Sequence, residues 1–264
     1  DDGSGALWKN PAAMARRTRT RAQLGLTSTD RESRYDTDRQ FVGLSPPTMT
    51  DRAGTQVALW GGAQFPVSDF VVLGAAWLAP PDLVFASAVP RDYSRPGDDG
   101  PHEYAQRYAA TRFALKRRGA GLAASVQPTP WLAVGASALA FETRVADERM
   151  IWAGTASDTP YANDYDLGLT ISSRDRFVPA FVVGAIVAPP SAPIEIGASF
   201  YWSDAARLAG APSLRPSRGT VSGLMDPLAT AQVMPDAQAQ ETMPLPWVAR
   251  AGVRFFFSRF SIDV

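Results

Sequence analysis

Strict alternation of apolar and polar residues between Ile194 and Ser203 is the feature that most limits how this chain can fold. The apolar set comprises Ile194, Ile196, Ala198, Phe200 and Trp202, and the intervening set comprises Glu195, Gly197, Ser199, Tyr201 and Ser203. Successive side chains of a strand point to opposite faces, so the segment predicts a strand with one apolar face. A proline-rich turn (residues 188–193) and a second apolar run (residues 181–187) precede it. Proline favours turns and cannot donate to a sheet ladder, so the whole unit predicts a hairpin.

The same hairpin pattern occurs three times in the sequence, over residues 58–78, 121–141 and 181–203. Each copy has a proline-containing turn and then a strand carrying Gly-Ala. The Gly-Ala pairs begin at residues 74, 135 and 197, so successive copies start 61 and 62 residues apart. Turns within a copy are short, whereas long polar segments separate the copies. Short turns at one end and long loops at the other predict an all-β fold, a transmembrane antiparallel β-barrel of the outer-membrane kind.

Eight strands and the start of a ninth follow from the pattern. We expect them at residues 17–24, 56–63, 70–78, within 104–127, 131–141, within 166–187, 194–202, 247–256 and from 260 onward. Residues 1–15 carry no strand pattern, with one helical turn expected at residues 11–16. The chain is therefore divided into a short non-strand segment (1–15) and barrel strands (16–264). Residues 142–164 and 204–243 are expected to be external loops.

One face of the three repeated strands carries no charge. It comprises Val71, Leu73, Ala75, Trp77, Leu132, Val134, Ala136, Ala138, Ile194, Ile196, Ala198 and Phe200. A charge at the bilayer midplane costs about 2–4 kcal/mol, so this face is expected to meet lipid. The opposite face mixes small, aromatic and polar residues, which suggests a lumen with a plug or an apolar passenger, and its glycines would mark close packing against that plug. Tryptophans near predicted strand ends (Trp60, Trp77, Trp131, Trp202 and Trp247) suggest interfacial girdles.

Composition removes several function classes. The net charge of +0 and pI near 6.8 leave no basic footprint for nucleic acid. With no cysteine and only His102, neither a disulfide framework nor a histidine-rich metal site is expected. No nucleophile–base pair, phosphate loop or metal spacing is visible, so we expect no enzyme and no cofactor. No signal peptide is visible at Asp1, and the chain stops in mid-pattern, so we take it to be incomplete.

Two sets of arginines alternate along predicted strands and would face a wet lumen. They are Arg17, Arg19 and Arg21 near the start, and Arg250 and Arg254 near the end. A solvated edge strand of a soluble sheet explains the first set equally well. In the long loop, Val221, Leu224, Met225 and Leu228 have helical spacing.

Scattered segments resemble the outer-membrane long-chain fatty-acid transporter (FadL/TodX) family. They are Asn10-Pro11-Ala12, PVSDFVVLGAAWLAP, PTPWLAVGASALAFE and LPWVARAGVRF. The resemblance implies a fourteen-stranded barrel in the bacterial outer membrane, plugged by a small N-terminal hatch. Residues 1–15 would be the remnant of this hatch or plug, with Asn10, Pro11 and Ala12 as its motif. The resemblance further implies a lateral opening at the third strand, here with Phe70, Val72, Gly74 and Ala76. The loop residues Val221, Leu224, Met225 and Leu228 would then form a capture groove.

The function expected is passive uptake of long-chain fatty acids or other hydrophobic small molecules by a monomer in contact with outer-membrane lipid and lipopolysaccharide. Two alternatives stay open on the sequence alone. One is a general or anion-preferring porin that uses the arginine rows. The other is a soluble or surface-adhesive β-domain.

Overall fold

The structure is a computed structural model that describes residues 5–16, 19–35, 49–52, 55–80, 82–86, 112–151, 167–216, 238–256 and 261–263. Two short helical segments come first, α1 (Ala6–Lys9) and η1 (Pro11–Arg16), the second where the sequence predicts a helical turn. All other elements are strands. They are β1 (Arg21–Thr29), β2 (Glu32–Tyr35), β3 (Met49–Arg52), β4 (Gln56–Ser68), β5 (Val71–Leu78), β6 (Leu83–Ala86), β7 (Arg112–Thr129), β8 (Leu132–Ile151), β9 (Leu167–Val187), β10 (Ile194–Ser203), β11 (Ala206–Pro216), β12 (Ala239–Met243), β13 (Val248–Phe256) and β14 (Ser261–Asp263).

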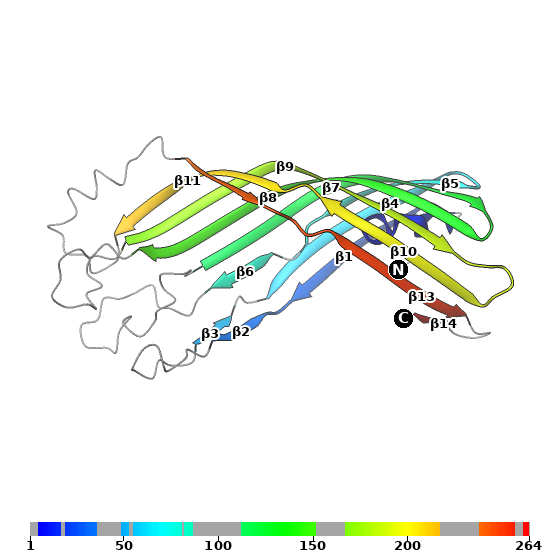
Figure 1. The fold of residues 1–264 in the computed structure, drawn as a ribbon, viewed down its shortest axis with the longest axis horizontal. Coiled ribbons are helices and arrows are strands. Elements are labelled where there is room, and N and C mark those ends of the chain that lie inside the picture. The colour runs from blue at the N-terminus through cyan, green and yellow to red at the C-terminus, as the bar shows by residue number, and fades with distance from the viewer. Residues whose placement is uncertain are drawn as a thin grey trace.

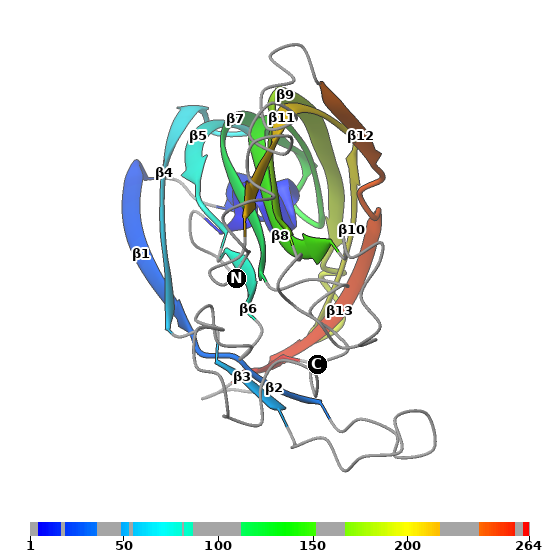
Figure 2. The same cartoon turned by 90° about the vertical axis from the view of Figure 1, so that its left-hand side faces the viewer.

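Nine strands form one hydrogen-bonded series in the order β1-β4-β5-β7-β8-β9-β10-β13-β14. All neighbours in the series are antiparallel. Shorter pieces extend it: β6 pairs with β7, β11 pairs with β9 and β12, and β2 pairs with β3 apart from the main sheet. The sheet curls around the two helical segments, which lie on its concave side (Figures 1 and 2). The predicted partial antiparallel barrel around an N-terminal hatch is therefore confirmed.

The predicted division of the strand faces is also confirmed. On β5, Leu73 is 46% exposed while its neighbour Val72 is 2% exposed, and the alternation continues to Leu78. On β10, Ile196 is exposed and Glu195 is buried. The charge-free set thus lies on the convex side of the sheet, and the mixed set lines the concave side.

Several strands run further than predicted. Residues 142–151, expected in a loop, continue β8, and β11 and β12 occupy parts of the expected loop 204–243. In the extension of β8, polar or charged residues occupy both faces: Thr143 and Asp147 on the inner face alternate with Glu142, Arg144 and Glu148 on the outer face. A period-two hydrophobic signal needs one dry face, so the sequence pattern fades where both faces are polar.

Interruptions of neighbouring strands fall at one level of the wall. The break between β5 and β6 lies beside residues 116–118 of β7, and the β8–β9 register shifts between Phe141 and Thr143. Residues 204–205 separate β10 from β11, and residues 244–247 separate β12 from β13. Apolar outward residues end at this level and charged ones begin. The described helices include none that is both long and apolar enough to span a membrane.

Candidate functional site

The hatch segment (residues 5–16) lies against inner-face glycines of three strands. A Cβ atom placed on Gly74 of β5 would lie 3.0 Å from a Leu7 methyl carbon and 3.1 Å from the Met14 sulfur. On Gly135 of β8 it would lie 2.5 Å from the Pro11 carbonyl carbon, and on Gly184 of β9 it would lie 2.1 Å from Asn10 Oδ1. The inner-face glycines do mark close packing against an inner plug, as predicted: a Cβ at Gly135 would meet hatch backbone, whereas a Cβ at Gly74 would require a small shift of the Leu7 and Met14 side chains.

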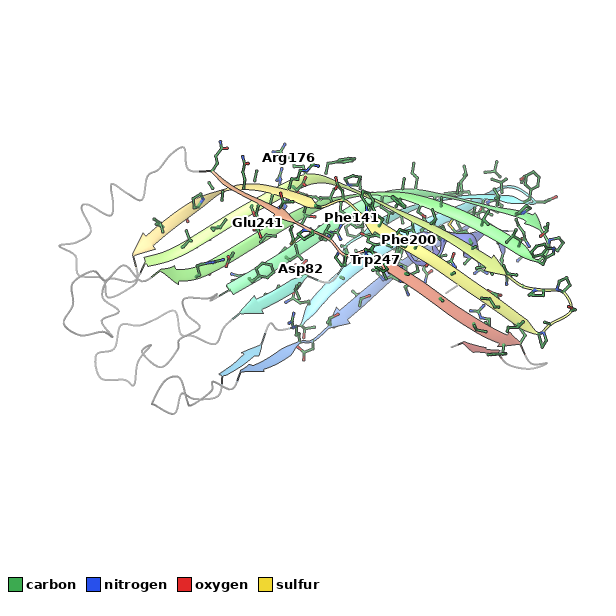
Figure 3. All side chains as sticks on the ribbon, viewed as in Figure 1. Asp82, Phe141, Arg176, Phe200, Glu241 and Trp247 are labelled. Carbon is green, nitrogen blue, oxygen red and sulfur yellow. The ribbon has the colours of Figure 1, made fainter. Side chains whose placement is uncertain are left out.

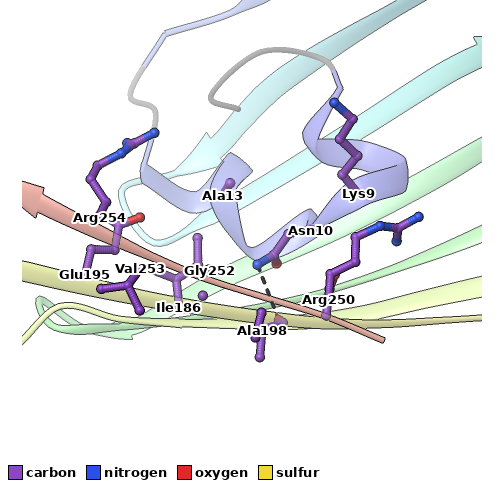
Figure 4. Close-up of a pocket in the computed structure, with 13 residues that line it drawn as sticks. Lys9, Asn10, Ala13, Ile186, Glu195, Ala198, Arg250, Gly252, Val253 and Arg254 are labelled. Atoms are coloured by element: carbon purple, nitrogen blue, oxygen red, sulfur yellow. Dashed lines mark hydrogen bonds between the residues drawn. The ribbon is translucent and has the colours of Figure 1, made fainter. Parts of the chain in front are cut away.

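Asn10 connects the turn between α1 and η1 to the wall. Its Nδ2 group lies 3.4 Å from the Ala185 carbonyl oxygen and 3.3 Å from the Ala198 carbonyl oxygen, two residues that are opposite each other on β9 and β10. Its Oδ1 atom accepts a hydrogen bond from the Ala12 amide at 3.2 Å. One side chain therefore shapes the hatch and also attaches it to two strands (Figure 4).

Serines and one ion pair complete the attachment. Ser125 of β7 donates to the Ala12 carbonyl oxygen at 3.3 Å, and Ser137 of β8 donates to the Leu7 carbonyl oxygen. Arg16 forms an ion pair with Glu195 of β10. Buried hatch carbonyls thus find wall donors, which avoids the cost of leaving them unpaired.

An aromatic chamber of about 470 Å³ lies beside the hatch on the inner side of the wall. Trp8 of the hatch packs edge-on against Trp60 of β4, with ring centroids 5.2 Å apart. Phe141 and Tyr201 line the chamber as well. The Arg117 guanidinium lies 4.4 Å above the Phe141 ring, and Lys9 and Arg250 also reach the chamber. Among the described residues that line it there are three cations and no carboxylate. The chamber therefore suits an apolar body that carries a negative group.

A second cavity, of about 270 Å³, lies between the hatch and β10 and β13. Lys9 and Asn10 line it from the hatch, and Glu195, Arg250 and Arg254 line it from the wall (Figure 4). Glu195 lies directly opposite Arg254 across the two strands. Arg250 is shared with the aromatic chamber, so cationic groups connect the two cavities.

Only some of the arginines predicted to face the lumen lie on the inner face of a strand. Arg21 is opposite Gln64, whose side chain is buried on the inner face, and Arg250 and Arg254 also belong to the inner face. Arg19 precedes β1 and is exposed, and Arg17 lies outside the described residues. Strand β1 begins at Arg21, not at residue 17, so the predicted arginine row is not a single strand row.

The strand predicted to open sideways is paired on both sides, although its ladder with β4 shifts register between Pro66 and Ser68. Over Val71–Leu78, β5 pairs with both β4 and β7, and Phe70 belongs to the turn before it. Val72, Gly74 and Ala76 face the hatch, and all three are buried. The predicted capture residues Val221, Leu224, Met225 and Leu228 lie outside the described residues.

Sequence reasoning missed the residues that shape the chamber. Trp60 was expected at an interfacial girdle, but it faces inward and packs on Trp8. No charge distinguishes the two faces of β4 around Trp60, so alternation alone does not assign its side. Arg117 lies in a basic run with Lys116 and Arg118, and only the strand register shows that Arg117 alone points inward. The described residues contain no group of three or more acidic or histidine side chains that could hold a metal ion.

Sequence comparison finds no match to a protein-family profile and no match to a curated protein. Structural comparison does find similar chains. A FadL homologue from Pseudomonas aeruginosa matches 99% of this chain at a TM-score of 0.69 and 15% identity. The toluene transporter TodX from P. putida matches at 0.61 and 13% identity, and a TodX deletion mutant described as a monoaromatic hydrocarbon channel matches at 0.62 and 13%. Both matches also cover 99% of this chain.

This chain spans 63–65% of the length of those three structures. At such low identity the similarity is one of fold. The resemblance predicted from the sequence is confirmed at that level: the chain has the fold of a large part of a FadL/TodX-like barrel, with the hatch seated inside.

Proposed function

We propose that this chain forms part of an outer-membrane channel through which hydrophobic small molecules, and long-chain fatty acids in particular, diffuse passively. It performs no chemistry on them. The observation that carries the proposal is the chamber beside the hatch, with aromatic walls and the cations Lys9, Arg117 and Arg250. An apolar tail gains about 25 cal/mol per Å² on leaving water, and a carboxylate gains charge-assisted hydrogen bonds.

The cations favour a fatty acid over an uncharged hydrocarbon. Hydrogen bonds to charged groups contribute about 1.5–3 kcal/mol each, which corresponds to roughly 10- to 150-fold in affinity. The similar structures include a toluene transporter. A neutral ring would use the aromatic walls but not the cations.

A comparison of two passengers tests the proposal. The protein is reconstituted in liposomes, and transfer of a long-chain fatty acid is measured beside transfer of its methyl ester. We expect Arg117→Gln with Arg250→Gln to slow the acid about tenfold or more and to change the ester little. The control is Arg112→Gln, because Arg112 lies on the outer face of β7. Equal slowing of acid and ester would contradict the role of the cations.

A covalent link between the hatch and β5 tests whether passage needs the inner face of that strand, where Gly74 lies against Leu7 and Met14 and the flanking Val72 and Ala76 are buried. Our proposal is that the hatch leaves this face and that Phe70 and these three residues of β5 then border a lateral exit. The chain has no cysteine, so cysteines at positions 14 and 74 would form the only possible disulfide. Oxidation should stop transfer into the lipid and reduction should restore it. Undiminished transfer by the oxidised protein would remove this strand from the route.

We also propose that the transported molecule is first captured by Val221, Leu224, Met225 and Leu228. Either Leu224→Asp or Met225→Asp should weaken fatty-acid binding at the cell surface, because a charge opposes contact with an acyl chain. Unchanged binding by both variants would remove these residues from the mechanism.

An anion-preferring porin is the second candidate, and inward Arg21, Arg250 and Arg254 favour it. Planar-bilayer recording separates the two functions. We expect small conductance, because the hatch occupies the concave side of the sheet and blocks the flow of ions. High, steady, anion-selective conductance would establish the porin instead.

A further inference from the structure

Six cations form two adjacent rows on the outer face of the wall, just beyond its apolar part. One row contains Arg118, Arg176 and Arg207, and the other contains Lys116, Arg144 and Arg174. Strand register places Arg118 opposite Glu142, Lys116 opposite Arg144, and Arg144 opposite Arg174. Arg207 of β11 donates its backbone amide to Asp175, the residue before Arg176. Arg176 projects away from the sheet (Figure 3). These six residues, the outer basic cluster, span β7 to β11, about 14 Å at strand spacings of about 4.8 Å.

Acidic groups offset part of this charge. Glu142 lies within 2.9 Å of Arg144 and 3.2 Å of Arg174, Asp82 lies 3.1 Å from Lys116, and Asp204 lies 4.0 Å from Arg207. Arg144, which donates a hydrogen bond to Glu142, lowers the pKa of that carboxyl, and the charges of Arg144, Arg174 and Arg176 lower it further.

Asp175 lies at the bulge of β9, opposite the inward Thr143, and its carboxylate accepts the backbone amides of Phe177 and Arg207, so we count its charge with the cluster as well. Six cations and four carboxylates leave a net charge of +2. Among the described residues, no carboxylate lies within 4.0 Å of the Arg118 or Arg176 guanidinium, and both side chains are exposed.

An apolar groove of about 950 Å³ begins directly below the cluster on the same outer face. Ala120 and Ala140 line it and come two residues after Arg118 and two residues before Glu142, respectively, so they belong to the same face. Its floor is formed by small residues, including Gly61, Ala63, Ala75 and Ala138, and its edges are formed by Leu24, Trp77 and Leu122. We name this feature the outer groove. Its volume and its mostly apolar lining suit an acyl chain, and none of its described lining residues is charged.

Aromatic residues mark the same level of the wall. Trp202 stacks on Phe181 with ring centroids 5.1 Å apart, and Phe177 and Trp247 are each 66% exposed. Exposed aromatics between an apolar band and a charged region are typical of a membrane interface. The level lies at the end of the apolar band opposite the short turns, and in outer-membrane barrels the side opposite the short turns is the external one.

From this arrangement we propose that the outer basic cluster and the outer groove bind one phosphorylated glycolipid of the outer leaflet, the lipid A part of lipopolysaccharide. Its phosphates lie on Arg118 and Arg176, where planar guanidinium groups match phosphate geometry. One acyl chain lies in the outer groove below. The two guanidiniums stand on different strands, which suits a wide headgroup with separated phosphates better than a single phospholipid phosphate. The inference rests on the proposed outer-membrane placement and not on the compound transported.

Binding of purified lipid A to the detergent-solubilised protein tests the proposal. We expect Arg118→Gln with Arg176→Gln to weaken binding about tenfold or more, while Arg112→Gln leaves it unchanged. Arg112 is the matched control because it lies six residues from Arg118 on the outer face of β7 and pairs with Glu148. If the double variant does not fold, the single Arg118→Gln variant serves the same comparison.

The groove is tested separately with Ala140→Phe, which fills it, and Ala136→Phe, which adds the same side chain to the outer face outside it. Only Ala140→Phe should weaken lipid A binding. Equal affinity for dephosphorylated lipid A would overturn the proposal, and so would equal affinity for phosphatidylglycerol micelles or for inorganic pyrophosphate alone. If only this inference fails, the natural protein does not bind lipid A but still transfers fatty acids. If the proposed function fails, fatty-acid transfer is absent whatever the lipid A result, so the two failures are distinguishable.

Discussion

At the scale of single residues, the hatch packs against the wall at glycines, which have no side chain on the inner face. Gly135 and Gly184 leave room for Pro11 and Asn10, whereas Ala136, beside Gly135, faces outward. These glycines lie inside strands, where the residue type is unfavourable by itself. Their cost is offset by the contacts that the hatch gains.

We expect Gly135→Val to displace the hatch, because even its Cβ would lie 2.5 Å from backbone atoms of Pro11 that cannot rotate away. Overpacking of this kind costs about 1–3 kcal/mol. Thermal melting should show the loss, and bilayer conductance should rise. Ala136→Val is the matched control and should melt like the natural protein. A hatch that stays protected from protease in Gly135→Val would contradict the close packing.

Asn10 allows a more specific prediction, because its Nδ2 group donates to the wall whereas its Oδ1 atom accepts within the hatch. Asn10→Ala loses the contacts to Ala185 and Ala198 and the Ala12 bond, at about 1 kcal/mol each. Asn10→Asp keeps an acceptor for Ala12 but turns a carboxylate oxygen toward two carbonyls. It should therefore leak more than Asn10→Ala in conductance recordings. The reverse order would show that Nδ2 does not hold the wall.

At the scale of elements, the sequence predicts the strands that have one apolar, uncharged face. It does not predict the extension of β8, in which both faces are polar. The repeats 58–78, 121–141 and 181–203 are each found as a hairpin, β4–β5, β7–β8 and β9–β10. The extension of β8 beyond Phe141 was expected to be a loop, because polar residues on both of its faces hide the period. Strand β11, beyond Ser203, was also expected in a loop, because its segment is rich in alanine, glycine and proline. The inward arginine of the run 116–118 could not be assigned either, since three consecutive basic residues show no alternation that separates the two faces, although β7 keeps one register with β8 from Arg112 to Val126.

A carboxylate at the β9 bulge should matter to the upper wall. Asp175 accepts the Phe177 amide at 3.0 Å and the Arg207 amide at 2.7 Å, and so joins the bulge to β11. Asp175→Ala should destabilise the protein by about 1–3 kcal/mol, because two backbone amides lose their acceptor. Asp175→Asn keeps one oxygen and should lose about half as much. Hydrogen exchange of the Arg207 amide is the direct readout, and protection unchanged in Asp175→Ala would contradict the assignment.

At the scale of the whole molecule, the height of the apolar outer band agrees with a membrane. On β9 it runs from Phe177 to Val187, about 33 Å at about 3.3 Å per residue. A strand tilt of about 40° reduces this to about 25 Å, the usual height of the apolar band of an outer-membrane barrel. Hatch, aromatic chamber and outer band together agree with the proposed passage, in which the interior is plugged and the exterior faces lipid.

The most direct measurement uses the absence of cysteine from the chain. Single cysteines at outward Ala138 and Ile196, and at inward Ser199 and Gln64, are spin-labelled after reconstitution in lipid. Collision with lipid-soluble oxygen and with a water-soluble nickel complex is then compared at each site. Our account predicts that oxygen dominates at positions 138 and 196 and does not dominate at positions 199 and 64. Equal access of the nickel complex to positions 138 and 196 would contradict it, because the charge-free face would then meet water.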